Sequence, residues 1–394
     1  MLAVKPPLGW NTWNTFGANI NENLILEMAE HMVSEGYLAA GYDYIVIDDC
    51  WSLKYRDKDG RLIPDPEKFP HGIRCLADQI HEMGLKLGIY SCSGARTCAG
   101  YPSSYDHEFV DAETFAEWGI DFLKYDFCNF PATGDCINRY HMMSMALKST
   151  GRDILFSACN WGSHEPWKWM SSIGAHMYRS TGDIMDNFTS FTNIFKSQIG
   201  NLCMSGVSCF NDMDMLTVGM GGKGNVGFGD VCTYEEYRMQ FSMWCLAGVP
   251  LMLGADLRGL SEEYRALLTN RYLLDIDQDE ECRPPYLVRK GSVFVSNTDP
   301  QPGEFPWKEI PDTSYVFLRH LKDRQFALAF INLANQEAEI HCEFADLGLP
   351  PASGTGLRLH DVFKDEDGGL ITDSFNPRVK GHDMQLYLCT LEKV

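Results

Sequence analysis

Several features that would narrow the function are missing from this chain of 394 residues. No apolar run is long enough to span a membrane, and no basic segment followed by an apolar stretch marks a secretion signal. Positive charge is scarce, because 33 Lys and Arg face 54 Asp and Glu and leave a net charge of −21. Such an acidic surface repels nucleic-acid phosphates. We therefore expect neither a membrane nor a nucleic-acid partner, and a cytoplasmic location unless a leader has been removed.

Metal-binding patterns are also missing. The 14 cysteines include no CxxC pair, and the 11 histidines form no HExxH motif. The acids of 211–215 lack the Gly and distant Glu of a calcium loop, and the glycine-rich stretch 219–229, which we interpret as a flexible loop, lacks the GK[ST] ending of a phosphate loop. Several cysteines lie in apolar runs, as small hydrophobic residues do. We expect mostly reduced cysteines, no metal and no cofactor, and we leave a homo-oligomer open.

What the chain does contain is a regular alternation of apolar runs and amphipathic segments between residues 8 and 280. The runs are 8–13, 42–48, 85–91, 120–126, 154–160, 176–183, 209–215 and 250–255. The helical candidates are 22–35, 73–83, 112–118, 137–148, 191–199, 234–246 and 261–268, and the connection after residue 160 is the weakest. Strands that alternate with helices indicate parallel βα units. Eight of them, spaced by roughly 30 residues, predict a (β/α)₈ TIM barrel over residues 1–280.

After residue 280 the pattern changes to short strand-like segments separated by Gly, Pro, Asn and Asp. These segments are 286–289, 292–296, 315–319, 326–332, 338–342 and 384–389. Helical periodicity is scarce here, so the sequence predicts a C-terminal antiparallel β-sandwich domain over residues 281–394.

Acidic side chains stand at the ends of several predicted strands, notably Asp126 and Asp183. The carboxyl ends of barrel strands meet at one mouth. A carboxylate is costly to remove from water, so each of these acids needs either a structural partner or a functional role. Hydrolysis of a glycosidic bond needs two carboxyl groups, and Lys124, on the same face of its strand as Asp126, would favour an ionised nucleophile. Two structural roles remain equally good alternatives: a Lys–Asp pair for Asp126 and a helix N-cap for Asp183.

Further residues at strand ends suit sugar binding. Asp48 and Asp49 are consecutive acids that can accept hydrogen bonds from vicinal sugar hydroxyls. Arg179 can donate hydrogen bonds to sugar hydroxyls. Trp10, Trp51 and Trp161 offer aromatic surface. A packing role is the better interpretation of any single Trp, and their shared position at strand ends favours the functional one.

These segments resemble glycoside hydrolase family 27, the α-galactosidase and α-N-acetylgalactosaminidase family, over both predicted domains. The matching segments are 8–13 (LGWNTW), 47–51 (IDDCW), 87–91 (LGIYS), 97–100 (TCAG), 123–128 (LKYDFC), 179–184, 211–216 (NDMDML), 250–257 (PLMLGADL) and 276–279 (IDQD). Their order and spacing across the predicted barrel make a chance similarity very improbable.

The resemblance implies a retaining, exo-acting hydrolase for terminal α-linked galactose on oligosaccharides or glycoconjugates, a small-molecule carbohydrate substrate. It implies Asp126 as the nucleophile and Asp183 as the acid/base. The implied sugar-binding residues are Trp10, Asp48, Asp49, Tyr90, Lys124, Cys159, Asn160, Trp161, Arg179, Asp214 and Met215. The family often has a disulfide where Cys98 and Cys128 match, which conflicts with a reducing compartment.

Three departures from the family pattern bear on specificity and origin. Asn160 stands where α-galactosidases usually carry Glu, near the 2-position of the sugar, and Phe210 replaces a usual Trp. Cys50 lacks the upstream partner of some secreted relatives, which favours a bacterial type. The alternatives are an α-N-acetylgalactosaminidase, a β-L-arabinopyranosidase, against which Asp49 argues, and a galactose-binding protein without activity, against which Asp126 and Asp183 argue.

Overall fold

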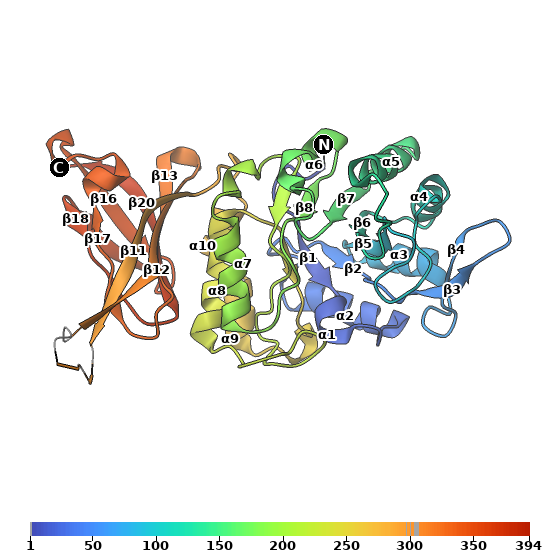
Figure 1. Ribbon diagram of the computed structural model, residues 1–394, viewed down its shortest axis with the longest axis horizontal. Helices are drawn as coiled ribbons and strands as arrows, with labels where there is room; N and C mark the ends of the chain where they lie inside the picture. The colour runs from blue at the N-terminus through green and yellow to red at the C-terminus, as the bar shows by residue number, and fades with distance from the viewer. Residues whose placement is uncertain (1, 297, 300, 303–306) are drawn as a thin grey trace. The chain divides into compact units, whose positions relative to one another are not determined.

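The computed structural model describes residues 2–296, 298–299, 301–302 and 307–394 (Figure 1). The chain forms two compact units that interleave in sequence. The first comprises Met1–Cys232 and Val249–Asn270, and the second comprises Thr233–Gly248 and Arg271–Val394.

The first unit is built on eight parallel strands in the order β10-β1-β2-β5-β6-β7-β8-β9. Shortly after β9, Leu216 forms a parallel bridge with Leu253 of β10, which joins the two edges of the sheet. The expected barrel is therefore confirmed, and its strands each lie within one of the eight predicted runs, except β5, which extends one residue beyond the run 85–91. They are β1 (Leu8–Asn11), β2 (Tyr44–Val46), β5 (Lys86–Cys92), β6 (Phe122–Asp126), β7 (Leu155–Cys159), β8 (Met177–Arg179), β9 (Phe210–Asp212) and β10 (Leu251–Leu253).

Most of the helices that alternate with these strands begin at polar side chains that cap their free amides, whereas α3 and α4 have no side-chain cap. Asn21, Asp135 and Asn187 each accept a hydrogen bond from the amide three residues later. The seven predicted helices are α2 (Glu22–Ser34), α3 (Gly72–Glu82), α4 (Glu108–Glu117), α5 (Cys136–Ser149), α7 (Phe188–Gln198), α8 (Tyr234–Ala247) and α9 (Glu262–Leu268). The weak fifth connection holds η1 (Pro166–Lys168) and α6 (Met170–Ile173).

Sequence periodicity did not reveal the short elements of the chain. These are α1 (Trp13–Phe16), α10 (Arg271–Asp277), the hairpin of β3 (Ser52–Arg56) and β4 (Leu62–Pro64), and the 3₁₀ turns η2 (Leu202–Met204), η3 (Leu257–Gly259), η4 (Lys322–Arg324), η5 (Phe344–Leu347) and η6 (Pro351–Ser353). Except for α10, which is as long as the predicted α9, each is too short for a periodic pattern to distinguish it from a loop. Within the described ranges, no helix combines the length and apolar character that a membrane crossing requires.

The second unit contains a six-stranded antiparallel sheet in the order β11-β12-β13-β20-β16-β17. Its strands are β11 (Tyr286–Ser296), β12 (Trp307–His320), β13 (Gln325–Asn332), β16 (Thr355–Asp361), β17 (Glu366–Ile371) and β20 (Asp383–Lys393). Two short pairs are separate from it: β14 (Ala338–Glu339) with β19 (Arg378–Val379), and β15 (Cys342–Glu343) with β18 (Ser374–Phe375). Val316, Phe330 and Leu359 of the large sheet share one apolar core with Cys342 and Val379 of the short pairs. This packing confirms the predicted sandwich.

Arg319 of β12 is a fully buried cation that joins three parts of the second unit. It is 1% exposed, and its guanidinium donates to the carbonyl oxygens of Cys245 (2.9 Å), Leu246 (3.2 Å) and Arg283 (2.8 Å). Two of these carbonyls belong to the last turn of α8, where the helix no longer supplies a full set of amide donors. The Gly248 backbone amide also reaches the Cys245 carbonyl, at 3.2 Å. A Cβ on Gly248 would lie 2.6 Å from this guanidinium, so the glycine makes room for it.

We expect Arg319→Leu to lower the free energy of unfolding of the second unit by about 3 kcal/mol, because buried carbonyls lose charged donors. Chemical unfolding of the full chain, followed by circular dichroism, measures this loss. Arg358→Leu is the matched control, because Arg358 pairs with Glu392 at the protein surface and should matter little. An equal loss in both variants would contradict the role given to Arg319.

Candidate active site

The register of β6 decides which of its side chains enter the barrel. Phe122 packs inside it with Tyr44, Leu155 and Met177. Because side chains alternate along a strand, Lys124 and Asp126 face the same interior, and each lies nearer to the carboxyl end of the strand.

Above these residues lies a cavity of about 260 Å³, slightly below the roughly 300–1,000 Å³ of typical small-molecule sites. Most of the residues that the sequence analysis singled out line this cavity. They are Asp48, Asp49, Tyr90, Cys98, Lys124, Asp126, Cys159, Trp161, Arg179, Asp183, Asp214 and Met215. The barrel thus brings Asp126 and Asp183 to one cavity. A larger cavity of about 420 Å³ is lined by Ile154 and His176, which precede their strands, so it lies at the other end of the barrel.

Asp126 is held in place by two hydrogen bonds. The Phe127 amide donates to its Oδ1 (2.8 Å), and the Tyr90 hydroxyl donates to its Oδ2 (2.9 Å). Burial raises the pKa of the Asp126 carboxyl, while the Lys124 ammonium and these two donors oppose the rise.

Lys124 pairs with Asp48. Its Nζ lies 2.7 Å from Asp48 Oδ2, which also accepts a hydrogen bond from the side-chain amide of Asn11 at 2.9 Å. Burial disfavours the Lys124 ammonium, but the nearby carboxylates, Asp48 first, more than offset this and raise its pKa. Asp49 accepts from the Ala99 amide at 3.0 Å, and burial raises the pKa of its carboxyl.

On the opposite side of the barrel, Arg179 contacts two acids. Its Nη2 lies 2.6 Å from Asp214 Oδ2 and 2.9 Å from Asp183 Oδ1. The Asp183 side chain is 64% exposed, whereas those of Arg179 and Asp214 are 4% exposed. The alternative that Asp183 is a helix N-cap is wrong, because the following helix, α7, is capped by Asn187.

Four of the acids are fixed by the same local hydrogen bond, which comes from the backbone amide of the next residue. Asp48, Asp49, Asp126 and Asp214 each accept a hydrogen bond on Oδ1 from the amide of the next residue, at 2.9, 2.7, 2.8 and 2.8 Å. Where a strand leaves the sheet, this amide no longer pairs with a neighbouring strand. The carboxyl group takes its place, which fixes the side chain and directs Oδ2 to other partners.

Backbone strain accompanies the site. Cys50, Trp161 and Asp214 have positive φ angles of 76°, 57° and 83°, which non-glycine residues rarely adopt. Strain of this kind concentrates at functional sites, where the surrounding structure compensates for it.

Two predicted sugar-binding residues, both within the described part of the chain, do not line the cavity. Trp10 is fully buried, and its indole donates to the Ala255 carbonyl at 2.7 Å. Asn160 is also buried, and its side-chain amide donates to the backbone carbonyl of Ser163 at 2.5 Å.

Sequence reasoning missed five lining residues: Trp13, Asn14, Met185, Asn225 and Val226. The last two belong to the glycine-rich stretch 219–229. The backbone amide of Asn225 donates to the backbone carbonyl of Asn14 at 2.7 Å, and the backbone amide of Gly222 donates to the Asp186 carboxylate at 2.7 Å. These hydrogen bonds hold the loop in place where it lines the cavity. Trp13 closes the first matching segment of the resemblance, which was the available signal for it.

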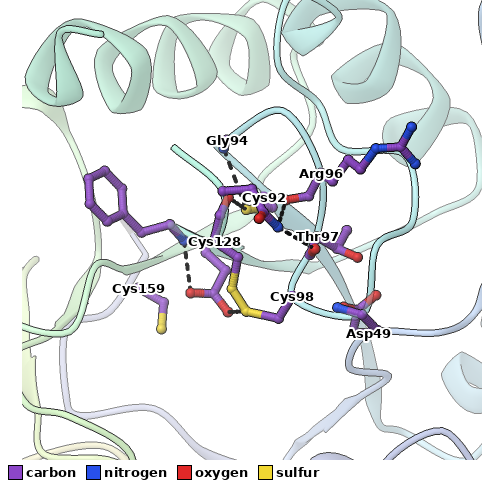
Figure 2. The surroundings of a disulfide bond; sticks show 12 residues. Asp49, Cys92, Gly94, Arg96, Thr97, Cys98, Cys128 and Cys159 are labelled. Atoms are coloured by element: carbon purple, nitrogen blue, oxygen red, sulfur yellow. Dashed lines mark hydrogen bonds between the residues drawn. A yellow bond between two sulfur atoms is a disulfide. The ribbon is translucent and has the colours of Figure 1, made fainter. Parts of the chain in front are cut away.

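A disulfide joins Cys98 and Cys128 beside Asp126, as the resemblance implied (Figure 2). It connects the loop after β5 to the residues that follow β6. None of the twelve other cysteines, all among the described residues, forms a disulfide.

Comparisons with known proteins extend over both units. The family profile "Alpha galactosidase A" matches residues 5–279, and "Alpha galactosidase C-terminal beta sandwich domain" matches residues 312–389. An alpha-galactosidase of Oryza sativa subsp. japonica is 43% identical, covering 99% of this chain and 85% of the relative. One of Cyamopsis tetragonoloba is 38% identical over 99% of this chain and 87% of the relative. The crystal structure of alpha-galactosidase I from Mortierella vinacea superimposes with a TM-score of 0.87 at 31% identity, covering 98% of this chain and 97% of that one.

We expect Lys124→Met to raise the pKa of Asp126 further, because the variant removes the charge that opposes burial. Carboxyl ¹³C NMR of protein labelled at aspartate measures this, with the resonance assigned by its loss in Asp126→Asn. Lys86→Met is the control, because Lys86 begins β5 and pairs with Asp43 at the other end of the barrel. An unchanged or lower pKa in Lys124→Met would refute this electrostatic role.

Proposed function

The chain belongs to the α-galactosidase family, glycoside hydrolase family 27, and from this premise we propose a retaining double displacement carried out by Asp126 and Asp183. The protein is a glycoside hydrolase with α-galactosidase function. We propose that it removes terminal α-linked galactose from oligosaccharides or glycoconjugates. The observation that carries the mechanism is that these two carboxyl groups line one cavity, Asp126 from the end of β6 and Asp183 from the loop after β8.

In the first step, an Asp126 oxygen attacks the anomeric carbon while the bond to the leaving oxygen breaks. Asp183, in its protonated form, gives its proton to that oxygen, and a β-linked galactosyl ester forms on Asp126. The hydrogen bonds from Phe127 and Tyr90 support this role, because they hold the carboxylate in one orientation.

In the second step, the ionised Asp183 removes a proton from water, and the water oxygen attacks the anomeric carbon. The bond to Asp126 breaks and α-galactose leaves with its configuration retained. The exposure of Asp183 supports both of its roles, because an aglycone and a water molecule can each reach it. Arg179 holds one of its oxygens and leaves the other available to carry the proton.

Selectivity for galactose is proposed to rest on the buried charges at the other side of the cavity. Asp48 and Asp49 offer acceptors for the 4- and 6-hydroxyl groups, and Lys124 offers a donor beside Asp48. On the 2-position side, Cys159 and Arg179 line the cavity, whereas Asn160 bonds the Ser163 carbonyl. We therefore assign no sugar contact to Asn160.

The two roles are separated by azide rescue of alanine variants. We expect Asp126→Ala to lose activity on aryl α-galactosides by at least about 1,000-fold and, with azide, to yield β-galactosyl azide, because azide attacks from the vacated face. Asp183→Ala should lose about 100-fold or more and yield α-galactosyl azide, because its nucleophile is intact. Proton NMR of the products distinguishes them. The same anomer from both variants, or a β-galactose product from the unaltered enzyme, would refute the mechanism.

We expect Asp49→Ala to lower kcat/KM for an aryl α-galactoside by about 100-fold, and to lower that for the β-L-arabinopyranoside far less, because the latter lacks the 6-hydroxymethyl group. Paired kinetics on the two substrates measure the difference. Asp48→Ala serves as the comparison, because the 4-hydroxyl group is common to both sugars. Equal losses of the two substrates in Asp49→Ala would exclude its contact with the 6-hydroxyl group.

A further inference from the structure

Beside the proposed nucleophile, three metal-ligand atoms lie close together. The sulfur atoms of Cys98 and Cys128 and a carboxylate oxygen of Asp126 are all within 4.8 Å of one another. Cys98 is exposed and lines the cavity, so small molecules can reach its sulfur through the mouth of the barrel. In the oxidised protein the two sulfur atoms are bonded to each other, and neither can bind a cation as a thiolate.

The spacing suits a tetrahedral metal once the disulfide is opened. Zinc bonds of about 2.3 Å to sulfur and 2.0 Å to oxygen place these atoms about 3.5 Å apart, and two sulfur ligands about 3.8 Å apart. The Cys98 sulfur already lies 3.7 Å from Asp126 Oδ2. The two sulfur atoms have to separate, and the Cys128 sulfur already lies within 4.8 Å of the Asp126 carboxylate oxygen. The exposed position of Cys98 on the loop after β5 permits the separation.

We propose that reduction of the Cys98–Cys128 disulfide creates an inhibitory site for a thiophilic divalent cation, held by both thiolates and the Asp126 carboxylate. A dithiol reductant supplies two electrons and two protons, the sulfur–sulfur bond breaks to give two thiols, and the reductant becomes a disulfide. Each thiol then releases its proton as it binds the cation. Two sulfur ligands and one carboxylate select Zn²⁺ or Cd²⁺ over Mg²⁺ and Ca²⁺, which prefer oxygen ligands.

A cation bound there blocks the reaction at its first step. The carboxylate oxygen that binds the metal is no longer available to attack a sugar, and the ion occupies space at the wall of the cavity. The loop that carries Cys98 also presents the Ala99 amide to Asp49. Movement of Cys98 toward a metal is therefore expected to weaken sugar binding by Asp49 as well. Because the cation and the sugar would occupy the same cavity, galactose should compete with the cation.

The test measures cation binding separately from activity. All proteins carry Cys75→Ser and Cys203→Ser, which remove the two exposed free thiols elsewhere in the chain. The protein is reduced, freed of reductant under nitrogen and titrated with Cd²⁺, whose bonds to thiolates give an ultraviolet charge-transfer band. Equilibrium dialysis gives the stoichiometry, and aryl α-galactoside turnover gives the inhibition. The oxidised protein is the matched control.

We expect the reduced protein to bind one equivalent of Cd²⁺, to lose activity in step with binding, and to regain it when a chelator is added. Cys98→Ser and Cys128→Ser should each weaken binding at least about tenfold, and Asp126→Asn should weaken it while keeping the thiolate band. Equal binding by oxidised and reduced protein, or unchanged binding in either serine variant, would overturn the site. Binding does not rest on the proposed role of Asp126, whereas inhibition does. Binding with unimpaired turnover would therefore overturn the inhibitory part alone.

Discussion

The site depends on the balance of buried charge at the mouth of the barrel. Five of its acids and two of its cations, Lys124 and Arg179, line one small cavity. A carboxylate removed from water is tolerated only when it is paired and hydrogen-bonded, and each cation meets a buried acid at about hydrogen-bond length: Asp48 at 2.7 Å and Asp214 at 2.6 Å. These two pairs stand on either side of Asp126, whose charge is therefore neither isolated nor neutralised by a direct ion pair. The nucleophilic role proposed for Asp126 needs this intermediate state, because a tightly paired carboxylate attacks poorly and an unpaired buried one takes up a proton.

The backbone also contributes to this balance. For four acids at three strand ends, the backbone amide of the following residue donates to the acid before it. The acids are therefore fixed by the same change of direction that ends each strand. The loops then connect the strand ends to one another. The Ala99 amide reaches Asp49, and the Asn225 amide reaches the Asn14 carbonyl. The geometry of the site is thus a property of the closed sheet, and no single segment of the chain would reproduce it.

Much of this arrangement could be predicted from the sequence, because periodicity and strand ends are local properties. The eight runs located the strands, and the acids after them located the mouth. What could not be predicted depends on distant contacts or on one torsion angle. Asn160 lies next to two lining residues, yet its own amide turns to the Ser163 carbonyl. Asn225 joins the site only because its loop is bound to a segment far away in sequence. Spacing alone did not pair Cys98 with Cys128, because that pairing depends on where the chain leaves two neighbouring strands; only the family resemblance indicated it.

The unequal exposure of the carboxyl groups has a consequence for what the protein can recognise. Asp48, Asp49 and Asp126 are between 2% and 6% exposed, whereas the side chain of Asp183 is 64% exposed. In the proposed mechanism, the sugar ring beside Asp126 is therefore the more enclosed part of the substrate, and the leaving group beside Asp183 is the more solvent-exposed part. Such a division would place most of the contacts that select a substrate on its terminal ring and few on the group attached to it.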